Sequence, residues 1–213
     1  MTLDVKSLYT NIDTSRGIEA VRKAMCSNPD PLRPDLEILE LLEICLKNNC
    51  FQFNGQNYIQ NNGAGMGHSY SVPYSNIYMA DWEKGALLKC IILPILFKRF
   101  IDDIILFWSH GFAKFLSFFN TLDSHDPNIK LTYTYQLNSI DFLDITIYKG
   151  LQFQVSGILD TRVYFKPTDS HELLHTSSFH PKHIFSGIVK SQIIRFHRTF
   201  LTLISHVKFY LMS

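Results

Sequence analysis

Charged residues are scarce in this chain of 213 residues: they make up 18% of it, and the formal net charge is only +1. Apolar residues account for 46%. This composition excludes a disordered polyelectrolyte and predicts a globular chain with a proper core. The charge balance neither favours nor excludes a nucleic-acid partner, because a basic groove can be offset by acidic helices elsewhere.

Cysteine pairs and long apolar runs are also lacking. The longest apolar run, residues 90–97, contains Pro94 and is followed by Lys98 and Arg99, so it is too short to span a bilayer. The sequence has no signal-peptide pattern, internal repeat or low-complexity linker. The cysteines form no CxxC pair and no small disulfide framework, which predicts reduced thiols in an intracellular protein. There are four of them: Cys26, Cys45, Cys50 and Cys90.

What the sequence does contain is a mixture of helical and strand-like periodicity. Asn54-Gly55 within residues 51–60 is a strong hairpin signal. The mixture predicts an α+β fold, with an antiparallel sheet backed by helices. Helices are expected over 13–25, 35–49, 72–89 and 111–122 and again after Pro167, and strands over 2–12 (leading into a turn), 97–107, 130–137, 139–149 and 159–166.

Two adjacent aspartates, Asp102 and Asp103, interrupt the apolar stretch "FKRFIDDIILFW". A turn at the tip of a hairpin can present both carboxylates while the flanking strands stay buried. Crowded carboxylates repel one another, and Mg²⁺ is a natural partner for them. Asp4, after a short apolar strand, could supply the third carboxylate of a two-metal site for phosphoryl transfer. The alternative is a solvated turn without a metal.

Five segments in order resemble the reverse transcriptases of Penelope-like retroelements across nearly the whole chain. They are "LDVKSLYTNI", "YIQNNGAGMGHSYSVPYSNIYMADWE", "KRFIDDIILFW", "IDFLDITIYKG" and "VYFKPTDSHELLHTSSFHPKHIFSGIVKSQIIRFHR". The resemblance implies a polymerase palm over residues 1–150 and an incomplete primer-grip hairpin with a helical, thumb-like region over 151–213. It also implies an intracellular, nuclear protein.

The first and third segments resemble polymerase motifs A and C. The resemblance implies that Asp4, Asp102 and Asp103 are catalytic and hold two Mg²⁺ ions, with the carbonyl of Val5 as a further ligand. Tyr9 would select deoxynucleotides by blocking a 2′-hydroxyl; the alternative is a buried structural aromatic.

The glycine-rich segment resembles motif B, whose backbone lies close to the templating base and the nucleotide. It departs from the family pattern, because "GAGMG" replaces a form with Thr-Ala between the glycines and Pro73 stands one position late. An ordinary flexible loop is the alternative. The residues implied to bind nucleotide here are Gly65, Met66 and Gly67, with Gly63 also in the loop.

The fourth segment contains Asp141 and Asp144, which we interpret as turn or strand-edge residues. Lys149 is a candidate proton donor to the leaving pyrophosphate, and a solvated lysine is the alternative.

The last segment carries cations that would meet the phosphates of a primer–template duplex. For each, a solvated helical face is the alternative. A zinc site at His171, His175, His180 and His183 is a further reading, although the spacing is not that of a standard finger. The implied nucleic-acid-binding residues are Lys166, His180, Lys182, Lys190, Arg195 and Arg198. His175 and His183 are further candidates for phosphate contacts.

The implied activity is RNA-directed DNA polymerisation, with an RNA template, a DNA primer and deoxynucleoside triphosphates as partners and no membrane. Basic fingers residues before Asp4 and the family's GIY-YIG endonuclease are not found in the sequence, so we expect these 213 residues alone not to extend a primer. Two alternatives stay open. One is an inactive retroelement remnant that at most binds nucleic acid, and the other is a two-metal nuclease, against which Tyr9 and the glycine-rich loop argue.

Overall fold

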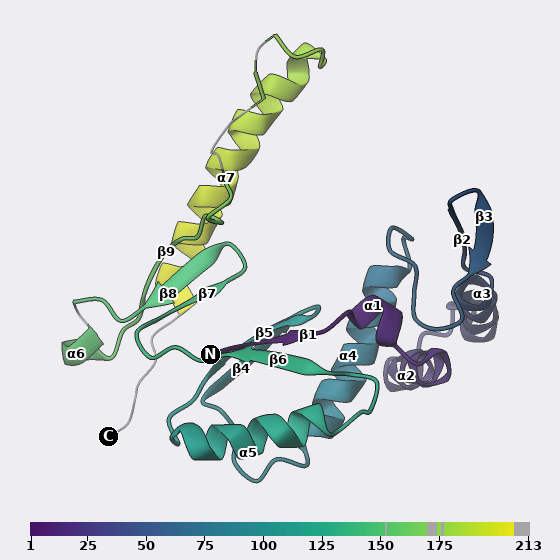
Figure 1. Cartoon of the computed structure of the whole chain (residues 1–213), viewed down its shortest axis with the longest axis horizontal. Helices are drawn as coiled ribbons and strands as arrows, with labels where there is room; N and C mark the ends of the chain where they lie inside the picture. The colour runs from purple at the N-terminus through teal and green to yellow at the C-terminus, as the bar shows by residue number, and fades with distance from the viewer. Residues whose placement is uncertain (152, 170–173, 176, 207–213) are drawn as a thin grey trace. The chain divides into compact units, whose positions relative to one another are not determined.

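The computed structural model describes residues 1–151, 153–169, 174–175 and 177–206, with side chains as far as His197. These residues form two compact units (Figure 1). The N-terminal unit comprises essentially residues 1–134, and the C-terminal unit begins at Tyr135. Each is described by itself below.

The N-terminal unit is built on a four-stranded sheet with the order β4-β5-β1-β6. β4 and β5 are antiparallel. β1 is also antiparallel to β5, because the Leu106 N–H donates to the Met1 carbonyl at 3.0 Å and the Val5 N–H donates to the Asp102 carbonyl at 3.2 Å. β1 is thus an interior strand, although it comes first in the chain. The strands are β1 (Thr2–Val5), β4 (Leu96–Phe100), β5 (Asp103–Phe107) and β6 (Leu131–Thr134).

Helices supply most of the core around this sheet. α2 and α4 pack closely, and a Cβ atom at Gly17 of α2 would lie 1.9 Å from the Tyr74 hydroxyl oxygen of α4. α4 buries one face, which includes Met79 and Trp82, and α5 buries Phe115, Phe118 and Leu122. Burial of these apolar side chains is what holds the layers together. The helices are α1 (Leu8–Asn11), α2 (Thr14–Ser27), α3 (Asp35–Lys47), α4 (Ser71–Leu87) and α5 (Phe112–Asp123).

A two-stranded hairpin, β2 (Cys50–Phe53) with β3 (Gln56–Ile59), stands beyond α3 (Figure 1). Its turn contains Asn54 and Gly55, both with positive φ, as the sequence predicts. Both strands are exposed along their whole length.

The C-terminal unit contains a three-stranded antiparallel sheet with the order β7-β8-β9 and the long helix α7, which contacts β9. Figure 1 shows α7 extending well beyond the strands of this unit. Its elements are β7 (Ser139–Phe142), β8 (Ile145–Tyr148), α6 (Phe153–Ser156), β9 (Asp160–Val163) and α7 (Lys182–His206).

The expected α+β class, with antiparallel strands and helices, is confirmed. The short helices α1 and α6 were not expected, and β6 is shorter than the predicted strand over 130–137. Single helical turns carry too few residues to leave a periodic signal. Within the described residues, no helix combines the length and apolar content that crossing a membrane requires.

Candidate functional site

Asp4 and Asp102 are brought together by the pairing of β1 with β5. Asp4 is exposed at the end of β1, between the buried side chains of Leu3 and Val5. The Val5 N–H donates to the Asp102 carbonyl at 3.2 Å, so the strand end lies directly beside the β4–β5 turn. Residues almost a hundred positions apart therefore meet because main-chain hydrogen bonds set the register.

The turn before β5 differs by one residue from the turn that the sequence suggests. Phe100 pairs with Asp103, so Ile101 and Asp102 form the two-residue loop and Asp103 begins the strand. Ile101 has φ 55°, which is rare for a β-branched residue and costs about 1–3 kcal/mol. Such strain persists only where neighbouring contacts impose it.

Burial and the charge of Asp102 raise the pKa of both neighbouring carboxylates, Asp4 and Asp103. Burial, together with the Asp102 carboxylate, raises the pKa of Asp4. Burial followed by Asp102 and then Asp4 raises the pKa of Asp103. Each of these two groups is therefore harder to ionise than a free aspartate, first because it is partly removed from water and then because another carboxylate lies near it.

The donor set fits a magnesium ion held in part by substrate. In the part of the chain that the structure describes, no three His, Cys, Asp or Glu side chains form a ready metal cage. Mg²⁺, however, is commonly bound by one or two carboxylates together with waters and substrate phosphates. Asp4 and Asp102, with Asp103 close enough to be affected by both charges, could supply the protein ligands of such an ion.

The glycine-rich loop is joined to Tyr9. The Ala64 N–H donates to the Tyr9 carbonyl at 2.7 Å. A Cβ atom at Gly63, where φ is +77°, would lie 2.1 Å from that same oxygen. The loop therefore packs backbone to backbone on the half-buried Tyr9 in α1, and only glycine permits this approach.

In the rest of the loop, one residue is held by a hydrogen bond and the next two are exposed. The Ser71 hydroxyl donates to the buried Gly65 carbonyl at 2.6 Å. Met66 is 80% exposed, and Gly67 has open space around it. The structure thus divides the loop into a fixed part and an exposed tip.

The Asn49 side chain also supports this loop, and the sequence did not single it out. Its amide donates to the Gln60 side-chain oxygen at 2.9 Å, and its own oxygen lies 3.1 Å from a ring nitrogen of His68. A Cβ atom at Gly65 would lie 2.7 Å from the Asn49 amide nitrogen. The one sequence signal was a polar residue directly before a strand, which is too common to be diagnostic.

The basic residues predicted to bind nucleic acid belong to the C-terminal unit. Arg195 is engaged with Asp144, since its Nε donates to the Asp144 carboxylate at 3.0 Å and its Nη2 forms a second hydrogen bond there. Asp144 lies in the turn between β7 and β8 and Asp141 lies in β7, which fits the turn or strand-edge interpretation. Lys166, His180, Lys182 and Lys190 are exposed, and so is Arg195 despite this pairing.

The structure describes only some of the other residues of the last segment that were predicted to bind nucleic acid or zinc. The side chain of Arg198 and the whole of His171 lie outside the described residues. His175 contacts the Ser177 hydroxyl, and His180 contacts the Ser178 hydroxyl. These contacts are with neighbouring serines, so they lend no support to a shared zinc ion.

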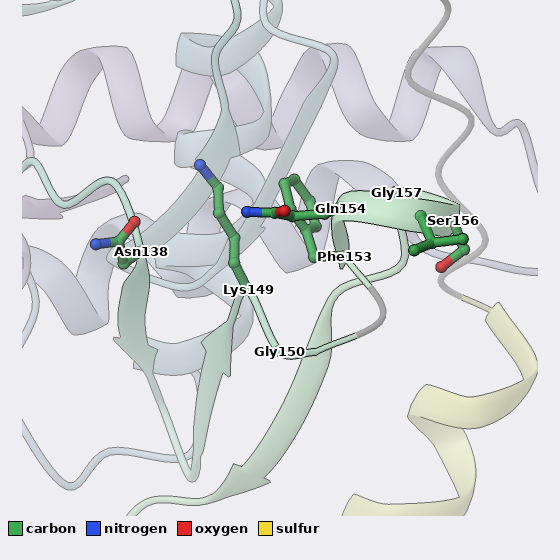
Figure 2. Close-up of a pocket in the computed structure, with 8 residues that line it drawn as sticks. Asn138, Lys149, Gly150, Phe153, Gln154, Ser156 and Gly157 are labelled. Carbon is green, nitrogen blue, oxygen red and sulfur yellow. The ribbon is translucent and has the colours of Figure 1, made fainter.

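Lys149 lines a hollow of about 860 Å³ in the C-terminal unit (Figure 2). Its Nζ lies 5.1 Å from the centre of the Phe153 ring, and its N–H donates to the Asn138 carbonyl at 2.9 Å. Figure 2 shows Lys149 and Gln154 pointing into the same hollow. These contacts all lie within the C-terminal unit. They do not test whether Lys149 donates a proton to the leaving pyrophosphate, which stays a prediction.

Comparison with solved structures finds a likeness to a telomerase. The structure of apo telomerase from Candida tropicalis, truncated from its C-terminal domain, superposes with a TM-score of 0.53 at 13% identity. The match covers 69% of this chain and 33% of the telomerase chain, so this chain spans about a third of the telomerase's length. No family model matches the sequence. No curated protein matches it either. The likeness shows a reverse-transcriptase-like fold.

Proposed function

We propose that the chain is the palm-bearing part of an RNA-directed DNA polymerase and that Asp4, Asp102 and Asp103 are its catalytic carboxylates. The observation that carries the proposal is the hydrogen bond from Val5 to Asp102, which holds Asp4 beside the Asp102 turn in a reverse-transcriptase-like sheet. The effect of Asp102 on the pKa values of Asp4 and Asp103 supports it further.

In the proposed reaction, the primer 3′-hydroxyl attacks the α-phosphate of a deoxynucleoside triphosphate. The hydroxyl gives up its proton to water, a new P–O bond forms, the bond from the α-phosphorus to the bridging oxygen breaks, and pyrophosphate leaves. Two Mg²⁺ ions would be held by Asp4, Asp102, Asp103 and the Val5 carbonyl, and would stabilise the attacking and leaving oxygens. The sheet contributes alignment, because phosphoryl transfer depends chiefly on positioning and on charge stabilisation.

The glycine-rich loop would lie against the nucleotide and the templating base. Gly63 and Ala64 contact the Tyr9 backbone, and Met66 and Gly67 form the exposed tip that would face the nucleotide. Gly65, the third residue implied to bind nucleotide, is buried beneath this tip. The Tyr9 ring would then exclude a 2′-hydroxyl. In the complete enzyme we expect Tyr9→Ala to increase incorporation of ribonucleotides relative to deoxynucleotides, and an unchanged sugar preference would contradict this role.

The C-terminal unit would act as a primer grip and partial thumb that binds the duplex backbone. Its exposed cations, Lys166, His180, Lys182 and Lys190, can contact phosphates without reading sequence. Arg195 already shares its charge with Asp144, so it would contribute less. The order of the five sequence segments further supports an origin in a Penelope-like retroelement and a nuclear location.

The proposal is tested by metal binding to the purified chain. Mn²⁺, a paramagnetic substitute for Mg²⁺, should bind to the wild type. Its binding is measured by electron paramagnetic resonance. Asp4→Asn and Asp102→Asn should each weaken binding by about tenfold or more, because each removes a charged ligand. The matched control is Glu43→Gln on α3, which removes an exposed carboxylate that pairs with Lys47. Binding that is unchanged in both aspartate variants would contradict the proposal.

A second experiment addresses the nucleic-acid partner. Binding of an RNA–DNA primer–template should weaken linearly with the logarithm of salt concentration, and Lys190→Ala should lower the slope by about one. Arg195→Ala should lower it less. An unchanged slope in Lys190→Ala would contradict phosphate binding by this lysine, and equal effects of the two variants would contradict the smaller contribution expected of Arg195. Cleavage of single-stranded DNA by the Mg²⁺-supplied chain would favour the nuclease alternative.

A further inference from the structure

Arg99 is joined to the carboxylate turn by a set of hydrogen bonds that the proposed chemistry does not use. It lies on β4, and only 10% of its side chain is exposed. Its Nε donates to the Glu83 carboxylate at 2.9 Å, and its Nη1 donates to the Asn76 side-chain oxygen at 3.3 Å. Nη1 also donates to the Ile101 carbonyl at 3.0 Å. One guanidinium therefore links helix α4 to the turn that precedes Asp102.

The two peptide groups on either side of Asp102 are consequently both held. The Ile101 carbonyl belongs to the peptide before Asp102 and accepts from Arg99. The Asp102 carbonyl belongs to the peptide after it and accepts from the Val5 N–H at 3.2 Å. With both peptide planes fixed, the direction in which the Asp102 side chain leaves the backbone is fixed as well.

The strained conformation of Ile101 explains why a clamp is needed. A β-branched residue at φ 55° has no intrinsic reason to stay there. Arg99 donates to the Ile101 carbonyl and Val5 to the Asp102 carbonyl, which makes the unfavourable conformation the one that satisfies the surrounding donors.

We infer that Arg99 is a positioning residue, which holds the Ile101–Asp102 turn against α4 so that Asp102 faces Asp4. The inference deepens the proposed function, on which its meaning for metal binding rests. Arg99 acts through hydrogen-bond geometry, because its planar fork serves Glu83, Asn76 and the turn at the same time. A lysine keeps the charge, but its donors all lie on one ammonium nitrogen, so it cannot reach the three acceptors that the planar guanidinium reaches.

The first measurement needs no metal. Hydrogen exchange of the Val5 amide reports whether Asp102 stays in register with β1, and it can be followed residue by residue by NMR. Arg99→Met should accelerate this exchange by about tenfold, because the turn loses the hydrogen bond from Arg99 to the Ile101 carbonyl. Arg99→Lys, which should fold even if Arg99→Met does not, is expected to accelerate it as well.

Arg33→Met is the matched control. Arg33 likewise donates to a carboxylate, Asp35, and to the main-chain carbonyls of Met25 and Asn28. It joins α2 to α3, so its loss should cost stability without changing Val5 exchange relative to other core amides. A merely structural role for Arg99 predicts the same behaviour in both arginine variants.

Mn²⁺ binding then separates this inference from the proposed function. Arg99→Met and Arg99→Lys should weaken Asp4-dependent Mn²⁺ binding by about tenfold or more, whereas Arg33→Met should not. Faster Val5 exchange in a chain whose wild type shows no Asp4-dependent Mn²⁺ binding would support the positioning role and contradict the metal assignment. Unchanged Val5 exchange in both Arg99 variants would overturn the inference, whatever the metal data show.

Discussion

The two units of this chain differ in how they hold their functional groups. In the N-terminal unit, the candidate carboxylates stand on a sheet whose central strand β5 has three consecutive buried residues, from Ile104 to Leu106. In the C-terminal unit, Ile140 and Ile147 are the buried apolar side chains among the described residues, and the predicted phosphate-binding cations are exposed.

This difference matches the chemistry proposed for each unit. A site that aligns reacting atoms needs rigid support, and deep packing with fixed main-chain hydrogen bonds supplies it. A surface that follows a phosphate backbone needs charge more than exact placement. The comparison therefore predicts large effects of substitutions in the first unit and small ones in the second.

The largest effect is expected in the core under the sheet. Phe115 is fully buried and contacts Trp108 and Tyr133, so Phe115→Ala should lower the free energy of unfolding by about 3–5 kcal/mol. Both tryptophans of the chain, Trp82 and Trp108, lie in the N-terminal unit, so urea unfolding followed by tryptophan fluorescence reports on that unit.

The matched control is Phe179→Ala in the C-terminal unit, where the side chain is fully exposed. It should change stability by less than about 0.5 kcal/mol, as judged by far-UV circular dichroism. Similar losses in the two variants would break the comparison between the units.

The next effect concerns glycines with and without space around them. Gly63→Ala should destabilise the N-terminal unit by about 1–3 kcal/mol, because the new Cβ would meet the Tyr9 carbonyl at a positive φ. Gly187→Ala on α7 has open space and should stabilise the C-terminal unit by up to about 1 kcal/mol. Thermal unfolding of the two variants measures both, and a tolerated Gly63→Ala would contradict the close backbone contact.

A smaller effect should appear in the pH dependence of stability. Because burial and Asp102 raise the pKa of Asp4 above its ordinary value of 3.8, the folded chain binds this proton more readily than the unfolded chain does. Stability is therefore lost as the pH rises from 3.8 through the raised pKa. Asp4→Asn should be more stable than the wild type at pH 7 by about 0.2–1 kcal/mol, and the gain should vanish in acid.

Asp126 provides the opposite case in the same unit. Burial alone would raise its pKa, but hydrogen bonds from Tyr78 and from the Asn128 N–H, together with Arg16, outweigh burial and lower it. Its contribution to stability is present above 3.8 and is lost as the pH falls through the lowered pKa. Urea unfolding at several pH values should show Asp126→Asn as destabilising at pH 7. Effects of equal sign in the two variants would contradict the assignment.

The smallest effect is expected at the Arg195–Asp144 pair of the C-terminal unit. The two side chains are 43% and 56% exposed, so the pair should contribute no more than about 1 kcal/mol and should be screened by salt. Arg195→Met, followed by circular dichroism at low and high salt, measures this. A loss comparable with that of Phe115→Ala would show that the C-terminal unit depends on its ion pairs.

By itself, the sequence determined the class of the fold and most of its elements, because periodicity, caps and turn residues act locally. The helix predicted from residue 13 forms, with the Asp13 side chain accepting from the Arg16 N–H, and Asn54-Gly55 forms the β2–β3 turn that the sequence predicts. The sequence also pointed to the Asp102-Asp103 pair as a candidate site.

Only the tertiary structure decided which distant groups meet. The insertion of β1 between β5 and β6 brings Asp4 to Asp102, and the register makes Ile101 and Asp102, rather than both aspartates, the turn. The packing of the glycine-rich loop on Tyr9 and the clamp from Arg99 to α4 likewise depend on contacts between remote segments. Strand order and side-chain partners are set by the burial of whole layers, a cooperative property that no local pattern encodes.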